Sequence, residues 1–350
     1  MPTKIRITRF CGLRTFLDSL SAGTGKTPPR RSFEFALFCP ALHKQCSSGG
    51  YYRKRRQGRG RNAALQLRTD LALEAVADRP LSEEDITLRS EEKDGVRLTY
   101  LHVRSAYGAR ELQKPQGRYV TMELPPLSDQ DSRLETYARR LGRELQAMLP
   151  PEGTVLVVGL GNSAITPDAL GPQTARLVLA TRHIEGEFAR STGLNDLRPT
   201  AVFATGVRGN TGVESAEAVR GLCSEVHPAA VIAVDALAAK SMARLGRTVQ
   251  LSDSGIAPGS GVGNTRRALN RETLGVPVIA VGVPTVVDAA TLVADLVGFE
   301  EAGQLNGCTM MVTPREIDLI VRRASRLIAM AVHSALQPAY SPLELMTIAE

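Results

Sequence analysis

The chain has 350 residues and a formal net charge of +7, and 43% of its residues are hydrophobic, which is enough to build a large core. Only 4% are aromatic and none is Trp, which disfavours an aromatic stacking platform for single-stranded nucleic acid. No apolar run approaches the roughly 18 residues of a membrane span, so we expect no membrane association.

Positive charge is concentrated in the first 60 residues. Residues 1–60 carry 13 Lys and Arg against 2 Asp and Glu, a net charge of +11, while the other 290 residues carry 30 and 34, a net charge of −4. This leader lacks the apolar stretch of a secretory signal, and we expect it to be disordered or to lie upstream of the true start. A nucleic-acid-binding arm built on the basic run 53–56 is the alternative, whereas no direct nucleic-acid contact is expected of the remainder.

Ordered structure is expected from about residue 61. Strand patterns at 95–103 and 117–126, followed by an amphipathic helix at 131–149, predict a small α+β region over residues 71–150. From residue 151 to 337, short apolar strands alternate with helices. The strands are expected at 154–160, 200–207, 230–237, 248–256 and 276–284, and the helices at 167–184, 213–226, 285–298 and 314–336. This alternation predicts an α/β core with a doubly wound, mainly parallel sheet and helices on both faces. Residues 338–350 are expected to form a tail.

Two acids follow strongly apolar strands in this core. Asp168 comes after VLVVGL at 155–160, and Asp235 closes the run AVIAVD at 230–235. Open α/β sheets place their chemistry at the carboxyl ends of strands, and a carboxylate pair there suits general acid–base hydrolysis. Each acid alone is also explained as a cap or turn residue.

Other motifs give weaker signals. Gly159 and Gly161 follow a strand as in a dinucleotide-binding turn, but the third glycine is missing, so a nicotinamide enzyme stays a minor alternative. The loop 257–264, with Gly259, Ser260 and Gly261, lacks the Gly-Lys-Ser/Thr of a phosphate loop, and we expect it to let a peptide or another subunit approach closely.

Asp253 and Asp288 also lie near strand ends and are second-tier candidates, with a structural role favoured. The five Cys have no paired spacing, which argues against a disulfide framework or a zinc site and fits a reducing cytoplasm. No two His have metal-ligand spacing, so no cofactor and no metal are expected.

Several long blocks, in order, resemble the germination proteases, also called spore proteases. The resemblance covers about residues 64–337. The blocks are RTDLALEA (68–75), VVGLGNSAITPDALGP (157–172), VIAVDALAAKS (231–241), SDSGIAPGSGVGNTRRAL (252–269), LGVPVIAVGVPTVVDAATLV (274–293) and MVTPREID (311–318).

The resemblance implies an atypical aspartic endopeptidase that degrades small acid-soluble spore proteins during germination. It implies a homotetramer in the cytoplasm of the developing forespore and in the spore core, made as a zymogen that removes its own N-terminal segment. The implied fold is phosphorylase/hydrolase-like, similar to that of the hydrogenase-maturation endopeptidases.

Carried onto this chain, the resemblance makes Asp168 and Asp235 the catalytic pair. It also makes Asp70–Leu71 the processing site, with 61–70 as the end of the prosegment, and substrates should present a similar acid-then-apolar bond.

The chain departs from these families in three places. The maturation endopeptidases use a metal-binding His after their second acid, but no His lies between Asp235 and His333. A metal-dependent endopeptidase therefore remains only an alternative, as does a spore DNA-associated protein that binds through the leader. The stretch 204–212 lacks the usual Pro-Gly at its start, and the segment before Leu71 is long for a prosegment.

Overall fold

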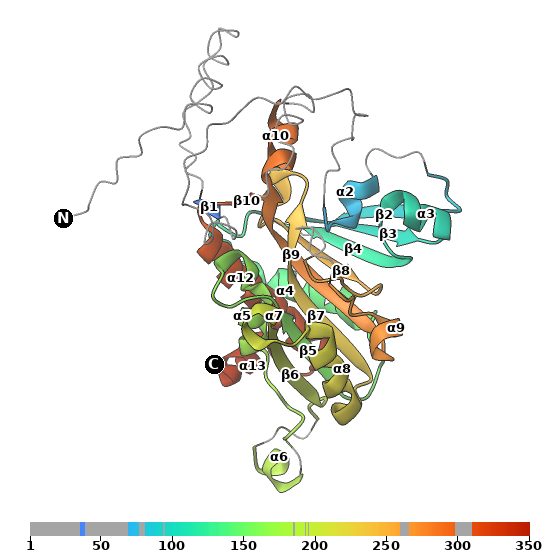
Figure 1. Ribbon diagram of the computed structural model, residues 1–350. Coiled ribbons are helices and arrows are strands. Elements are labelled where there is room, and N and C mark those ends of the chain that lie inside the picture. The colour runs from blue at the N-terminus through green and yellow to red at the C-terminus, as the bar shows by residue number, and fades with distance from the viewer. Residues whose placement is uncertain are drawn as a thin grey trace, which may run out of the picture. The chain divides into compact units, whose positions relative to one another are not determined.

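The computed structural model describes residues 36–38, 69–76, 81–93, 95–184, 186–192, 194, 196–259, 266–297 and 310–350 (Figure 1). Apart from the short strand at 36–38, the leader therefore lies outside the described residues. Within the described part of the chain, ten strands join in one mixed sheet. The strands are β1 (Ala36–Phe38), β2 (Ile86–Lys93), β3 (Val96–Val103), β4 (Gly117–Glu123), β5 (Val155–Leu160), β6 (Thr200–Gly206), β7 (Ala230–Ala239), β8 (Thr248–Ser252), β9 (Val278–Asp288) and β10 (Met311–Thr313).

The main path of the sheet runs β2-β3-β4-β8-β9-β7-β5-β6. The four strands β9, β7, β5 and β6 are parallel to one another, as predicted for the core. The others pair antiparallel: β8 joins β9 to β4, and β10 links β9 to β1. The region 71–150 thus shares one continuous sheet with the core instead of building a sheet of its own.

Helices cover both faces of the parallel strands, which confirms the predicted fold class. They are α2 (Ala72–Val76), α3 (Ala106–Leu112), α4 (Leu134–Gln146), α5 (Leu170–Leu177), α6 (Gly186–Thr192), α7 (Arg208–Thr211), α8 (Ser215–Val226), α9 (Arg271–Leu274), α10 (Ala289–Val297), α12 (Ile317–Leu336) and α13 (Pro342–Ala349), with 3₁₀ turns η1 (Thr166–Asp168) and η2 (Met242–Arg244). In Figure 1, α5 and α12 lie to the left of β5 and β7, and α8 lies to the right.

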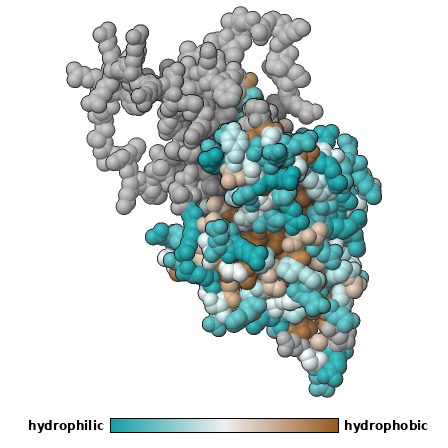
Figure 2. Space-filling model, turned by 90° about the vertical axis from the view of Figure 1, so that its right-hand side faces the viewer, coloured by the Kyte–Doolittle hydropathy of each residue, from teal (hydrophilic) through white to brown (hydrophobic). Residues whose placement is uncertain are grey.

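The core strands alternate between two hydrophobic clusters, because successive side chains of a strand point to opposite faces. Val155 and Val157 of β5 pack in the cluster under α4 and α12, whereas Leu156 and Val158 pack under α8. Strands buried on both faces read as continuous apolar runs, and the sequence could therefore locate them. Figure 2 shows apolar surface gathered in the middle of one side of the molecule, with hydrophilic residues around it.

Two predicted helices have different bounds. The helix expected at 167–184 is a 3₁₀ turn followed by α5, which ends at Leu177. The first residues of the helix expected at 285–298 belong to β9, where Val286 and Val287 pair with Ala238 and Ala239 of β7. The expected tail contains α13, whose Leu345 is buried. None of the described helices is both long enough and apolar enough to cross a lipid bilayer.

Candidate active site

Asp168 is held by a tight turn that follows β5. Gly161 adopts a φ of +113°, and a Cβ on it would come within 2.1 Å of the backbone oxygen of Asp168. The amide of Asn162 donates to that oxygen at 3.1 Å and to the Asp168 carboxylate at 2.9 Å. Thr285 on β9 donates to the carbonyl of Pro167 at 2.8 Å. The turn and the sheet therefore fix the half-buried Asp168 at the end of β5.

Asp235 lies within β7, just beyond the point where the neighbouring strand β5 stops pairing with β7. The pairing of β5 with β7 stops at Gly159 and Val234, so Asp235 is the next residue beyond their last contact. β7 itself continues to Ala239, two residues beyond the predicted strand 230–237, so Asp235 lies inside the strand and not at its end. The side chain is only 5% exposed, and its carboxylate accepts the amide of Ala236 at 2.9 Å. Beyond the last β5–β7 pair, η1 lies next to the sheet and contacts both β7 and β9.

The carboxyl groups of Asp168 and Asp235 are electrostatically coupled. Burial raises the pKa of Asp235 well above its ordinary value, and the negative charges of Asp168 and then Asp70 raise it further. Burial also raises the pKa of Asp168, while the Asn162 amide and the positive charge of Arg266 lower it. The pKa of both acids is therefore raised, more strongly for Asp235, which makes Asp235 the acid of the two that binds a proton more readily.

The predicted processing bond lies at the same place. The amide of Asp70 donates to the carbonyl of Ala238 at 2.9 Å, and the Ala238 amide donates back to the Asp70 carboxylate at 2.8 Å. The side chain of Gln250 bridges the bond: it donates to the carbonyl of Asp70 at 3.1 Å and accepts the amide of Ala72 at 2.7 Å. Leu71 is fully buried. The main chain is thus held on both sides of the Asp70–Leu71 bond, by the Ala238 main chain and by the Gln250 side chain.

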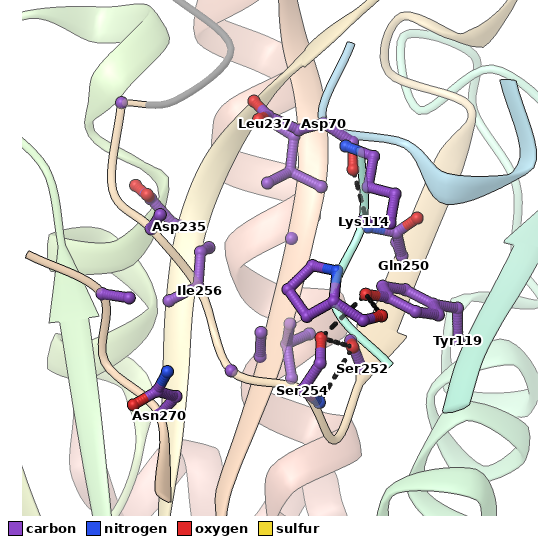
Figure 3. Close-up of a pocket in the computed structure, with 18 of the residues that line it drawn as sticks. Asp70, Lys114, Tyr119, Asp235, Leu237, Gln250, Ser252, Ser254, Ile256 and Asn270 are labelled. Carbon is purple, nitrogen blue, oxygen red and sulfur yellow. Dashed lines mark hydrogen bonds between the residues drawn. The ribbon is translucent and has the colours of Figure 1, made fainter. Parts of the chain in front are cut away.

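Several of the residues described above line a cavity of about 210 Å³ (Figure 3). Asp70, Asp235 and Gln250 line it, together with Lys114. The Lys114 ammonium donates to the carbonyl of Thr69 at 2.7 Å. In Figure 3, Asp235 and Lys114 lie on opposite sides of the cavity. The cavity lining therefore includes one acid of the predicted pair, the residue before the predicted processing bond and a lysine, whereas Asp168 and Leu71 are not among the lining residues.

The second-tier acids have structural contacts. Asp253 accepts from the guanidinium and the amide of Arg118, each at 2.7 Å, and so joins the end of β8 to β4. Asp288 accepts the amides of Ala290 and Thr291 at the start of α10, as an N-cap residue does. These contacts account for both carboxylates without a catalytic role.

The glycine-rich loop is only partly described. Gly259 lines the cavity, and Ser260 and Gly261 lie outside the described residues. Gly159 packs against α5 instead of opening a nucleotide site, since a Cβ there would come within 2.3 Å of the Gly171 carbonyl. In the described part of the chain, no three His, Cys, Asp or Glu side chains are grouped to hold a metal ion.

Three site residues were not predicted from the sequence. Gln250 is a polar residue within the apolar strand TVQLS, and this interruption was a usable signal. Arg266 belongs to the block 252–269 but stands out there by charge alone. Lys114 lies in a short connection after α3 and had no signal, since only the fold brings it to the cavity.

Comparison with known proteins identifies the family. A family model described as germination protease matches residues 68–301. A germination protease of Caldanaerobacter subterraneus is 37% identical over 319 residues, covering 80% of this chain and 97% of the relative. The one from Clostridium perfringens is 36% identical over 311 residues, covering 78% of this chain and 95% of the relative, and the one from Priestia megaterium is 40% identical over 248 residues, covering 67% and 66%.

A structural comparison finds a [NiFe] hydrogenase maturation protease, HycI, from Thermococcus kodakarensis, at 18% identity and a TM-score of 0.31. The match covers 54% of this chain and 98% of that one. The matches in sequence confirm the resemblance read from the sequence blocks above, and the chain belongs to the germination protease family.

Proposed function

We propose that this protein is an endopeptidase that hydrolyses small acid-soluble spore proteins during germination, with Asp168 and Asp235 as its catalytic pair. Membership of the germination protease family supports a protease with a role in spores. The observation that carries the catalytic assignment is the cavity that Asp235 and Asp70 both line, with the charges of Asp168 and Asp70 both acting on the Asp235 carboxyl.

The two acids have different roles in the proposed reaction. Asp168, whose carboxylate accepts the Asn162 amide at 2.9 Å, takes a proton from the water whose oxygen adds to the peptide carbonyl carbon. Asp235 keeps its proton and donates it to the leaving amine nitrogen as the C–N bond breaks. Gln250 donates to the carbonyl oxygen on which negative charge develops, as an oxyanion donor does.

We further propose that the protein cuts its own chain between Asp70 and Leu71 and cuts substrates at a similar acid-then-apolar bond. The contacts of the Ala238 main chain and the Gln250 side chain support this site, because they hold the main chain on both sides of the bond. After cleavage the buried Leu71 would become the first residue of the mature chain.

The test uses the full chain and follows self-cleavage by intact mass and N-terminal sequencing. Wild-type protein should yield a fragment that begins at Leu71, while Asp168→Asn and Asp235→Asn should stay intact and folded. Asp318→Asn, at an exposed position in the first turn of α12, is the matched control and should be cut like wild type. Cleavage in either folded active-site variant would refute the pair.

Substrate, assembly and location have separate tests. A purified small acid-soluble spore protein should be cut after acidic residues that precede apolar ones, as mapped by mass spectrometry of the products. Native mass spectrometry should give a homotetramer, and fractionation of sporulating cells should find the protein in the forespore and spore core. A different pattern of cuts would contradict the proposed cleavage specificity without contradicting the proposed peptidase activity.

A further inference from the structure

Strand β9 has one residue more than its neighbour β7 near the carboxyl end of the parallel strands. The pairing with β7 skips one residue of β9 between Pro284 and Val286, so Thr285 forms a β-bulge. A bulge redirects a side chain out of the regular alternation of a strand, and bulges are frequent next to active sites. Thr285 is only 1% exposed, and its hydroxyl donates to the carbonyl of Pro167 at 2.8 Å. The bulge therefore directs a buried hydroxyl at the turn that carries Asp168.

The Thr285 hydroxyl binds the peptide group directly before Asp168. The carbonyl of this group, from Pro167, accepts the hydroxyl, and its amide, from Asp168, donates to the carbonyl of Ile165 at 2.8 Å. Because a peptide group is planar, hydrogen bonds at both its oxygen and its nitrogen fix its rotation. The direction in which the Asp168 side chain leaves the backbone is thereby set as well.

Within the described part of the chain, the Thr285 hydroxyl makes the one hydrogen bond between this turn and the sheet. The other hydrogen bonds of residues 162–168 are made with one another or with Ala169, so they shape the turn without orienting it on the sheet. Packing against α12 and the strands keeps the turn close, and the hydroxyl supplies the directional contact. Thr285 is itself anchored, since its carbonyl accepts the buried hydroxyl of Thr313 on β10 at 2.8 Å.

We propose that Thr285 is a positioning residue, which sets the direction of the Asp168 carboxylate relative to Asp235 through the carbonyl of Pro167. This inference rests on the proposed peptidase function. Thr285 does not touch the reacting atoms, and its contribution comes from the hydroxyl and not from the shape of the side chain. Thr285→Val would keep nearly the same shape and leave the buried carbonyl without its donor.

The test compares self-cleavage of full-length chains by intact mass, on variants that circular dichroism shows to be folded. Thr285→Val should slow formation of the fragment that begins at Leu71 by at least about tenfold, since a misplacement of about 1 Å lowers catalysis on the order of 100-fold. Thr285→Ser keeps the hydroxyl and should be cut at close to the wild-type rate. Thr285→Ala differs from Thr285→Ser by the hydroxyl alone and should be slowed like Thr285→Val.

Thr200→Val is the matched control. Thr200 is also 1% exposed, and its hydroxyl also donates to a backbone carbonyl, that of Arg198 at 3.1 Å. It lies at the start of β6 beside Val155, the first residue of β5, whereas Asp168 follows the other end of β5. The cost of deleting a buried hydroxyl should therefore lower the stability of both variants in urea, while only Thr285→Val should be cut more slowly.

A second measurement does not depend on cleavage. In the Asp235→Asn background, the amides of residues 162–169 should exchange hydrogen at least about tenfold faster with Thr285→Val than with Thr200→Val, because the turn loses its anchor to the sheet. Unchanged exchange in these residues would contradict the positioning role.

The remaining outcomes separate this inference from the proposed function. Cleavage of Thr285→Val at the wild-type rate, or equal slowing of Thr285→Ser and Thr285→Val, overturns the inference and leaves the proposed peptidase intact. Failure of both hydroxyl-free variants to fold would assign the hydroxyl to folding and would equally overturn it. Absence of any wild-type cleavage overturns the proposed function, and this inference with it.

Discussion

Gly171→Ala is expected to separate the two proposed catalytic acids by pushing a helix off the sheet. A Cβ on Gly171 would lie 2.2 Å from the oxygen and 2.4 Å from the nitrogen of Leu160, and 2.5 Å from the oxygen of Val234. All three atoms are backbone atoms of β5 and β7, and they cannot turn aside as a side-chain end can. α5 must therefore rise from both strands to admit a single methyl group.

The cost follows from the packing. Overpacking a close contact of this kind costs about 1–3 kcal/mol, and the gain from replacing glycine in a helix, about 1 kcal/mol, offsets only part of it. Asp168 lies three residues before Gly171, at the end of η1, so the displacement of α5 moves Asp168 relative to Asp235. A misplacement of about 1 Å lowers catalysis on the order of 100-fold.

Urea unfolding and the rate of self-cleavage measure the two effects on the same samples. Gly221→Ala is the matched control, because Gly221 lies in the middle of α8 with no atom near its added Cβ. This control should gain about 0.5–1 kcal/mol and cleave normally. If Gly171→Ala unfolds at the same urea concentration as the control and is cut at the wild-type rate, the close approach does not position Asp168.

Three further predictions concern pH and metal. The folded pKa of Asp235 lies above that of the unfolded chain, so this group lowers stability as pH rises from about 4 through its folded pKa. Asp235→Asn should remove that fall and be more stable than wild type in urea at pH 7; a less stable variant would contradict the assigned burial cost. Burial lowers the pKa of His333 to about 4, so stability should decline by about 3 kcal/mol as pH falls from about 6.5 to 4. His333→Gln should flatten this acid limb, and an unchanged slope would exclude His333 as its source. A chelator should leave the self-cleavage rate unchanged, whereas inhibition reversed by added zinc would favour the metal-dependent alternative.

The sequence was most informative where burial leaves a pattern. β5 and β7 pack against helices on both faces, and their unbroken apolar runs located them to within a few residues. Periodicity misjudged residues 285–288, because a run such as TVVD is compatible with a helix until Val286 and Val287 are found paired with β7. The antiparallel joining of β4 to β8 left no local pattern, since it depends on segments more than 100 residues apart.

The same distinction applies to the site. Asp168 and Asp235 could be proposed because each follows an apolar run and matches a family block. Gln250 and Lys114 meet Asp70 only through tertiary structure, as three separate segments converge on one cavity. Residues that bind a neighbouring backbone or balance a charge carry no motif, and chain order does not show which segments lie close in space.

The two hydrogen bonds by which Gln250 bridges residues 70 and 72 also restrict which peptide chains could bind in the same place. It uses the carbonyl of the residue before the bond and the amide two residues later, while Ala238 binds the amide and the side chain of the residue before the bond. In the interior of a helix or in an internal strand of a folded protein, those backbone groups are already hydrogen-bonded to the protein itself, whereas the amide of Ala72 is available because Ala72 is the first residue of α2. A peptide that binds in the same way as residues 70–72 must therefore have backbone amides and carbonyls that are not already hydrogen-bonded within its own fold. In the proposed peptidase, this geometry would select substrates by conformation as well as by sequence, favouring loosely structured chains and sparing stably folded proteins.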